Sequence, residues 1–109
     1  MNKKQIAKEF ANEVTKMFGD EIDEIILFGS VARGEDDVES DIDILIIWNG
    51  DKVKGWDKLE EMAFDFFIRY NTLISINLIS PAEYKHMENF LFMKNLQKEG
   101  MVILVQAHC

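Results

Sequence analysis

Two aspartates, Asp41 and Asp43, stand two positions apart at the start of the most strand-like run of the sequence, residues 42–47. Side chains at positions i and i+2 of a strand point to the same face, with their backbones about 6.5–7 Å apart. Both carboxylates can therefore converge on one cation. Hard oxygen ligands on a rigid strand suit Mg²⁺, which also binds substrate phosphates. The pair indicates a divalent-metal site, although the same two residues taken alone could be a solvated strand end.

Gly29 and Ser30 precede this pair and have the features of a phosphate site. They directly follow an apolar run at residues 22–28 and open a short helical turn around residues 31–33. Glycine lets the backbone approach a ligand closely, and free N–H groups at the start of a helical turn favour anions. If the two strands are neighbours, a phosphate cradle sits beside a carboxylate pair, and such an arrangement holds a nucleoside triphosphate. Taken alone, Ser30 could be only a helix N-cap, and Arg33 only a surface residue.

The remaining pattern supplies the elements that would position these residues. Hydrophobic periodicity and turn residues predict helices over residues 2–18, about 53–71 and 80–98, and strands over 22–28, 42–47, 73–79 and 102–105. The start of the last helix has three agreeing signals: Ser80 as N-cap, Pro81 at the first helical position and Glu83 closing a capping box. This order predicts an α+β fold, a mixed αβ domain in which helices cover a mixed sheet of about four strands.

Length and composition narrow the functional classes. The 109 residues can bury a real core and show no repeat or linker, so we expect a single domain over residues 1–109. No apolar run approaches the ~20 residues of a membrane span. The single cysteine, Cys109, cannot form an internal disulfide, which favours a cytoplasmic setting. A net charge of −8 repels nucleic-acid backbones and argues against nucleic acid as a partner.

The spacing of these residues resembles a known signature. Gly29-Ser30, ten further residues and then Asp41-Ile42-Asp43 resemble the G-S-x10-D-x-D motif of the polymerase-β-like nucleotidyltransferase superfamily. The stretches "FGSVARGE" and "SDIDILI" are closer still to its minimal members, the MNT proteins that occur as antitoxins beside HEPN-domain toxins. The resemblance is strong over residues 27–47, where the predicted strand context agrees with it, and length and element order extend it loosely to the whole chain.

The resemblance implies a nucleotidyltransferase palm and a reaction that depends on Mg²⁺ or Mn²⁺. An NMP, for which AMP is expected, would pass from an NTP such as ATP to an acceptor hydroxyl. Asp41 and Asp43 would be the catalytic, metal-binding residues. Gly29 and Ser30 would hold the β- and γ-phosphates, with Arg33 as a neighbouring phosphate ligand. Catalysis of this kind consists mostly of positioning and charge neutralisation.

The chain departs from the superfamily pattern at one position. A third carboxylate usually stands on a later strand, commonly within V-D-L-V, and the best match here is "INLI", which places Asn77 there. Ser75 and Asn77 would share one face of that strand. An amide cannot act as a base and brings no charge, though its oxygen could still ligate a metal weakly. Nucleotide binding by Asp41 and Asp43 survives this departure, whereas transfer would need another base, such as a carboxylate of the loop at residues 35–39.

The acceptor is expected to be a protein. Larger relatives carry an additional domain that grips the acceptor, and this chain has no residues left for one. A partner that brings its own surface, in this family a HEPN toxin, is the economical interpretation. The consecutive apolar residues Phe90, Leu91, Phe92 and Met93 cannot all face one side of a helix, which suits a partner-binding helix or a homodimer.

Functions of different classes stay open at this point. The first is an MNT-type nucleotidyltransferase that places NMP on its partner. The second is a binding module that holds nucleotide, or nothing, and neutralises the toxin by contact alone, with Asn77 marking lost catalysis. A regulatory subunit of a larger nucleotidyltransferase complex is a third.

Overall fold

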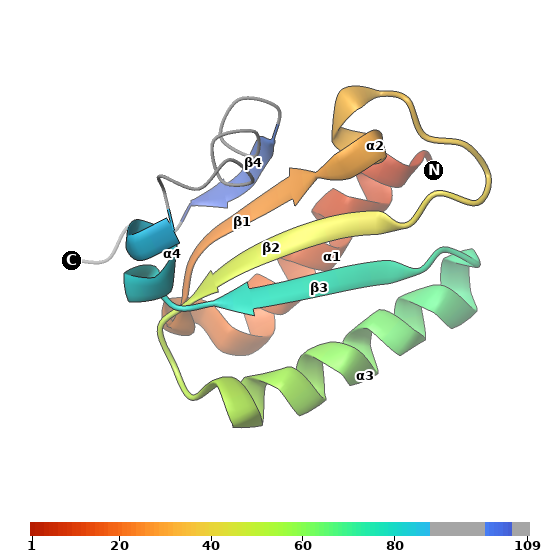
Figure 1. The fold of residues 1–109 in the computed structure, drawn as a ribbon. Coiled ribbons are helices and arrows are strands. Elements are labelled where there is room, and N and C mark those ends of the chain that lie inside the picture. Colours follow the sequence, from red (N-terminus) through yellow and green to blue (C-terminus); the bar gives the residue numbers. More distant parts are fainter. Residues whose placement is uncertain (88–99, 106–109) are drawn as a thin grey trace.

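The computed structural model describes residues 1–87 and 100–105 (Figure 1). Over these ranges the elements are, in chain order, α1 (Lys3–Phe18), the 3-10 turn η1 (Gly19–Glu21), β1 (Ile22–Phe28), α2 (Gly29–Arg33), β2 (Ile42–Trp48), α3 (Lys52–Tyr70), β3 (Ile74–Ile79), α4 (Pro81–Met87) and β4 (Met101–Val105). The helix predicted over residues 80–98 is seen as α4 up to Met87. Its remainder, with the apolar run at residues 90–93, lies outside the described residues. Within the described ranges, no helix combines the length and apolar character that crossing a bilayer requires.

The described strands form one mixed sheet in the order β3-β2-β1-β4. β1 is antiparallel to both β2 and β4, whereas β2 and β3 are parallel. Parallel neighbours need a crossover connection, and α3 supplies it. α1 and α3 pack into the main core on one face of the sheet (Figure 1). This architecture confirms the predicted α+β class, with a mixed sheet of about four strands covered by helices.

The central strand β2 is apolar on both faces for most of its length. Alternate residues from Ile42 to Trp48 pack against α1 and α3 in the main core. Leu45 and Ile47 belong to a smaller cluster on the opposite face, which α4 partly covers at the end where β2 finishes (Figure 1). Asp43 begins that second face at the other end of the strand. The fold therefore places one polar position on an otherwise apolar strand.

Capping boxes fix where α1 and α4 begin. Asn2 and Gln5 form a capping box at α1. Ser80 and Glu83 form another at α4, each backbone N–H donating to the other side chain at 3.0 Å, with Pro81 as the first helical residue. The start of α4 predicted from the sequence is therefore confirmed. Such boxes satisfy backbone donors that a helix start otherwise leaves unpaired.

Candidate nucleotide and metal site

Asp43 lies on β2 between two neighbouring strands. Its register partners are Phe28 on β1 and Ser75 on β3. Ile42 and Ile44, on either side of it in sequence, are buried in the main core, so Asp43 points to the opposite face of the sheet. Adjacent strands are about 4.8 Å apart, and Ser75 therefore stands directly beside Asp43. The side chain of Asp43 is partly buried in this position.

Gly29 directly follows β1 and lies against the Asp43 carboxylate. Its φ is 76°, in the left-handed region that favours glycine. A Cβ atom added to Gly29 would lie 3.2 Å from Cγ of Asp43 and would collide with Oδ2. The missing side chain thus lets the carboxylate lie against the backbone of Gly29-Ser30. The two strands are neighbours, and the two halves of the predicted site meet.

Asp41, Asp43 and Arg33 are close enough to act on one another electrostatically. Partial burial raises the pKa of the Asp43 carboxyl, the negative charge of Asp41 raises it further, and the positive charge of Arg33 offsets part of this rise. Asp41 lies just before β2 and is exposed. Arg33 ends α2, where its Nε donates a hydrogen bond to Oε2 of Glu35 at 3.1 Å. All of the residues singled out in the motif therefore surround one region.

Ser30 occupies a different helical position from the one predicted. α2 begins at Gly29, with Phe28 at the N-cap position, and no side chain caps it. Ser30 is therefore inside the first turn rather than the N-cap residue, so that expectation was wrong. The physical reason is that Gly29, through its left-handed φ, makes the change of direction from β1 into α2, which leaves Ser30 within the first turn.

The β3 side of the site carries polar but uncharged residues. Ser75 pairs in register with Asp43, and Asn77 pairs with Leu45, so both lie on the face of Asp43. Ile74 lies on the other face, in the main core. In the part of the chain that the structure describes, no three His, Cys, Asp or Glu side chains form a group that could hold a metal ion. The site thus has two carboxylates, and the register makes Ser75 the nearer neighbour of Asp43.

Lys3 supports the segment before Asp41, a role that was not predicted from the sequence. Its ammonium donates to the carbonyl oxygens of Asp37 at 2.6 Å, Val38 at 3.3 Å and Ser40 at 2.5 Å. The loop also bonds within itself, because the Asp37 N–H donates to Oγ of Ser40 at 3.0 Å. The loop is exposed, yet one lysine from α1 binds three of its carbonyls. Local sequence patterns could not predict this contact, because its two partners lie more than 30 positions apart.

The donor set fits a small, hard divalent cation. Carboxylate oxygens are the ligands that Mg²⁺ prefers, and Mg²⁺ is typically bound through one or two carboxylates plus waters and phosphates. The mutual repulsion of Asp41 and Asp43 is the electrostatic situation that a cation relieves. The cradle at Gly29, which a Cβ atom would fill, leaves space for this arrangement.

The sequence model of the family described as "Nucleotidyltransferase domain" matches residues 7–102. The chain belongs to this family. A Methanocaldococcus jannaschii protein named "putative protein adenylyltransferase" is 34% identical over 94% of this chain and 99% of its own length. These findings confirm the family resemblance predicted from the motif.

Solved structures agree on the fold. A crystal structure described as a putative nucleotidyltransferase from Sulfolobus solfataricus shares 25% identity, covers 94% of this chain and 79% of its own, and has a TM-score of 0.58. A toxin–antitoxin structure with AMP-PNP shares 17% identity over 91% of this nucleotidyltransferase and 73% of its own chain, with a TM-score of 0.57. A complex of a tri-AMPylated Shewanella oneidensis HEPN toxin with an MNT antitoxin shares 15% identity over 94% and 72%, with a TM-score of 0.50. The last two likenesses concern the fold alone.

Proposed function

We propose that this nucleotidyltransferase binds a nucleoside triphosphate, ATP, together with Mg²⁺, and transfers AMP to a hydroxyl group of a partner protein. Asp41 and Asp43 would hold the cation, Gly29 and Ser30 would hold the β- and γ-phosphates, and Arg33 would add a positive charge nearby. The observation that carries this proposal is the close approach of the Asp43 carboxylate to the backbone at Gly29. It supports the proposal because the carboxylate that would hold the cation lies beside the turn that would bind the phosphates.

The chemistry assigns a limited task to each residue. The acceptor oxygen forms a bond to the α-phosphorus, the bond from that phosphorus to the bridging oxygen breaks, and pyrophosphate leaves. When bound, Mg²⁺ neutralises charge on the phosphates. Ser75 and Asn77 cannot take the acceptor's proton at neutral pH. A carboxylate of the loop at residues 35–39 or a water molecule would receive it.

ATP and a protein acceptor are favoured by the relatives. The Methanocaldococcus relative is named as a protein adenylyltransferase, and the Shewanella complex is described as a tri-AMPylated HEPN toxin with an MNT antitoxin. By this analogy the acceptor is a HEPN toxin, the present chain is its antitoxin, and residues 1–109 act as a single domain. The cytoplasmic setting predicted from the single cysteine is part of the same proposal.

Calorimetry of ATP binding, with and without Mg²⁺, tests the nucleotide site directly. The wild-type protein should bind ATP only with the metal, and Asp43→Asn should lose this binding. Asp36→Asn is the matched control, since it makes the same chemical change on an exposed loop residue outside the carboxylate pair. Equal binding by Asp43→Asn and the wild type would overturn the site assignment.

A contact-only antitoxin is the second candidate function. It is favoured by Asn77, an uncharged residue at the position where the superfamily usually carries a third carboxylate, and by the uncharged Ser75 beside Asp43 on the same strand as Asn77. Incubation with ATP labelled on the α-phosphate and a purified HEPN toxin separates the two. Label on the toxin that disappears with Asp41→Asn supports transfer. Toxin neutralised without label, and equally well by Asp41→Asn, would establish the contact-only function instead.

A further inference from the structure

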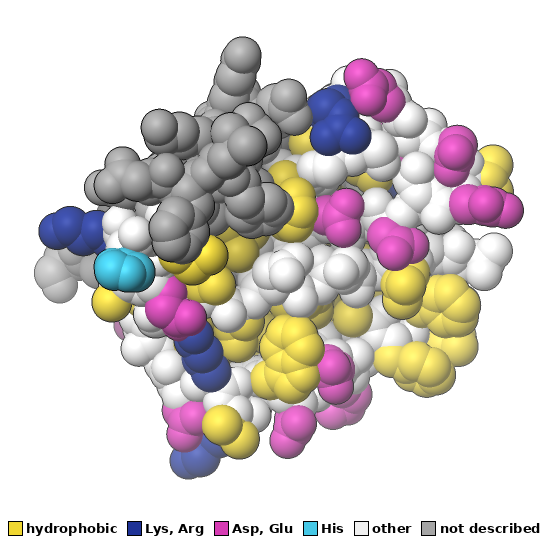
Figure 2. All heavy atoms as spheres, viewed as in Figure 1, with side chains coloured by type: hydrophobic (Ala, Val, Ile, Leu, Met, Phe, Trp, Pro, Cys, Tyr) yellow, Lys and Arg dark blue, Asp and Glu magenta, His cyan; other side chains and the backbone are white. Residues whose placement is uncertain are grey.

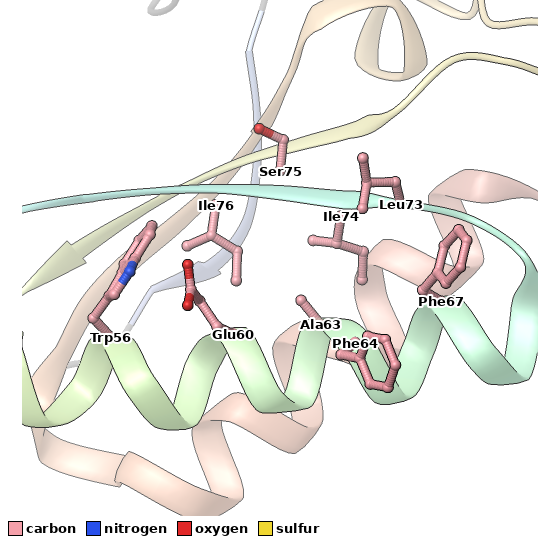
Figure 3. Close-up of a pocket in the computed structure, with 9 residues that line it drawn as sticks. All are labelled: Trp56, Glu60, Ala63, Phe64, Phe67, Leu73, Ile74, Ser75 and Ile76. Atoms are coloured by element: carbon pink, nitrogen blue, oxygen red, sulfur yellow. The ribbon is translucent and has the colours of Figure 1, made fainter.

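A groove runs between α3 and β3, along the edge of the described sheet. It has a volume of about 510 Å³ and is lined mainly by apolar side chains, among them Trp56, Phe64 and Phe67 on α3, Leu73 just before β3 and Ile76 on β3. Figure 3 shows Trp56, Glu60 and Phe67 reaching up from α3 toward the strand, while Ile74 and Ile76 point down toward the helix. The two elements thus form the walls of one hollow.

The groove is longer than this hollow. A second hollow of about 470 Å³ shares Trp56 and Ile76 with the first and extends it along β3 to Leu78. The apolar surface here is unusually open, because Phe64 is 65% exposed and Leu73 is 50% exposed. Figure 2 shows hydrophobic side chains over α3 and β3, interrupted by acidic ones. Contiguous apolar surface of this kind marks a binding site more often than a plain exterior.

The upper wall of the groove is an edge strand. Among the described strands β3 has one neighbour, β2, and the Leu73 carbonyl accepts from the Ile42 N–H at 2.9 Å. Because peptide groups alternate in direction along a strand, those of Ile74, Ile76 and Leu78 point outward. From Ile74 to Ile79 the strand has no charged residue and no proline, and its pairing with β2 shows no bulge. Charged residues, prolines and bulges are the usual features that protect an edge strand from pairing. The described β3 edge lacks them and is therefore open to an added strand.

The charge of the groove tells what kind of strand would fit. Glu60 is the one charged residue among the side chains that line the first hollow, and it projects from α3 toward β3 (Figure 3). In the second hollow Lys52 pairs with Glu83, while Asp57 has no ion-pair partner within the described ranges. The unbalanced charge along the groove is therefore negative. A second copy of this chain, whose net charge is −8, would bring carboxylates against carboxylates.

We infer that the edge of β3 and the α3 groove dock an extended segment of a partner protein. The segment adds a strand to β3 through the outward peptide groups. Its alternate side chains enter the groove, and these are apolar except for a lysine or arginine opposite Glu60. Main-chain hydrogen bonds of this type give affinity, and the pockets for alternate side chains give specificity. The whole chain's acidity would also speed the approach of a basic partner.

The edge of β3 lies close to the candidate nucleotide site, so docking there would position the acceptor of AMP. This step rests on the proposed function. Ser75 lines the groove and is also the register partner of Asp43. A strand added to β3 would lie about 10 Å from β2, at two strand spacings. The docked partner would thus stand beside the nucleotide site as the acceptor of AMP. Docking itself needs neither nucleotide nor metal.

The probe is a short fluorescein-labelled peptide with Thr at every second position and Val, Lys and Val between them. Fluorescence anisotropy measures its binding to the full chain without nucleotide. Wild type should bind it saturably, and the same peptide with Glu in place of Lys should bind at least about tenfold more weakly. Glu60→Lys should reverse this preference. Glu61→Lys is the matched control, because it makes the same charge change at the next position of α3, outside the groove lining.

Each result has a defined meaning. Reversal by Glu60→Lys alone, together with loss of binding when the peptide amides are N-methylated, supports strand addition in the groove. No saturable binding, or the same preference in Glu60→Lys as in wild type, overturns it. Sedimentation that shows a dimer dissociated by Phe64→Glu also overturns it, because the groove would then join two copies. ATP binding measured on the same samples keeps failure of docking distinct from failure of the nucleotide site.

Discussion

The Asp43 carboxylate occupies the space that a side chain at Gly29 would need. This contact links the end of β1 to the start of β2. The Asp43 carboxylate can take its position only because Gly29 has no side chain. The left-handed φ of 76° at Gly29 adds a second reason for glycine. The two reasons can be separated by experiment, because the chain contains another left-handed glycine in open space.

Gly29→Ala is expected to lose Mg²⁺-dependent ATP binding, because the new methyl group displaces the carboxylate. Gly34→Ala is the matched control: its φ is 74°, and an added Cβ meets nothing within 4 Å. Both variants should lose about 1–2 kcal/mol of unfolding free energy from backbone strain. Calorimetry and urea unfolding measure the two effects. If Gly34→Ala also abolishes binding, strain rather than the contact with Asp43 explains the loss.

Lys3→Met is expected to weaken Mg²⁺-dependent ATP binding severalfold by releasing the loop that leads to Asp41. Three carbonyls lose a charged donor, and each hydrogen bond to a charged group contributes about 1.5–3 kcal/mol at most. Lys4→Met removes the neighbouring charge of the same helix and should leave binding unchanged. Calorimetry on both variants checks this. Equal weakening in the two would mean that only the net charge matters.

Asn77→Asp is expected to raise the rate of AMP transfer about tenfold or more, since it adds a carboxylate to the face of Asp43. Asn12→Asp, on the exposed surface of α1, makes the same chemical change away from the sheet and should have no effect. Labelled-nucleotide transfer to the partner is the measurement. A rate unchanged from wild type in a folded Asn77→Asp protein would remove position 77 from the site.

Gly55→Ala is expected to destabilise the fold, although alanine usually favours a helix over glycine by about 1 kcal/mol. Gly55 is buried in α3, and an added Cβ would lie 2.6 Å from Cζ2 of Trp48. Overpacking of this kind typically costs about 1–3 kcal/mol. Urea unfolding should show the loss, and Lys54→Ala, at the exposed neighbouring position, should not. A more stable Gly55→Ala protein would mean that Trp48 can move aside.

The contribution of Glu83 to stability should depend on pH. Hydrogen bonds with the Lys52 side chain, and with the backbone and side chain of Ser80, lower the pKa of Glu83 from 4.5 to about 2. Because the folded-state pKa is the lower one, the stabilisation is present above pH 4.5 and disappears as the pH falls toward about 2. Glu83→Gln should therefore be less stable than wild type near neutral pH, and the gap should shrink in acid. The measurement is urea unfolding of both proteins at several pH values. A difference in unfolding free energy that stays the same at every pH would contradict the prediction.

Local patterns predicted the elements well, and the reasons are visible in particular residues. Apolar runs predicted β1 over its observed length and β2 to within one residue of its end at Trp48. The capping box of Ser80 and Glu83 predicted the start of α4, because both residues act within one helical turn. These signals depend only on residues that are close in sequence, so one sequence is enough to recognise them.

Long-range relationships were beyond the sequence. The register that sets Ser75 rather than Asn77 beside Asp43 depends on how two strands separated by α3 align. The contact of Lys3 with the loop and the groove along β3 arise in the same way, from elements that meet only in the folded chain. The motif did predict that Gly29 and Asp43 share a site, but the collision between them required coordinates.

The hairpin of β1 and β2 has a consequence for how the protein can change over time. Gly29, Asp41 and Asp43 all belong to the stretch from β1 to β2, which pair antiparallel, whereas Ser75 and Asn77 lie on β3, after the α3 crossover. The residues proposed to hold the cation therefore come from one contiguous stretch of the chain, and a residue that could supply a base would come from a different strand, β3. Substitutions on β3 can alter or erase chemistry while nucleotide binding persists, so a lineage can exchange an enzyme for a binding protein without rebuilding its fold.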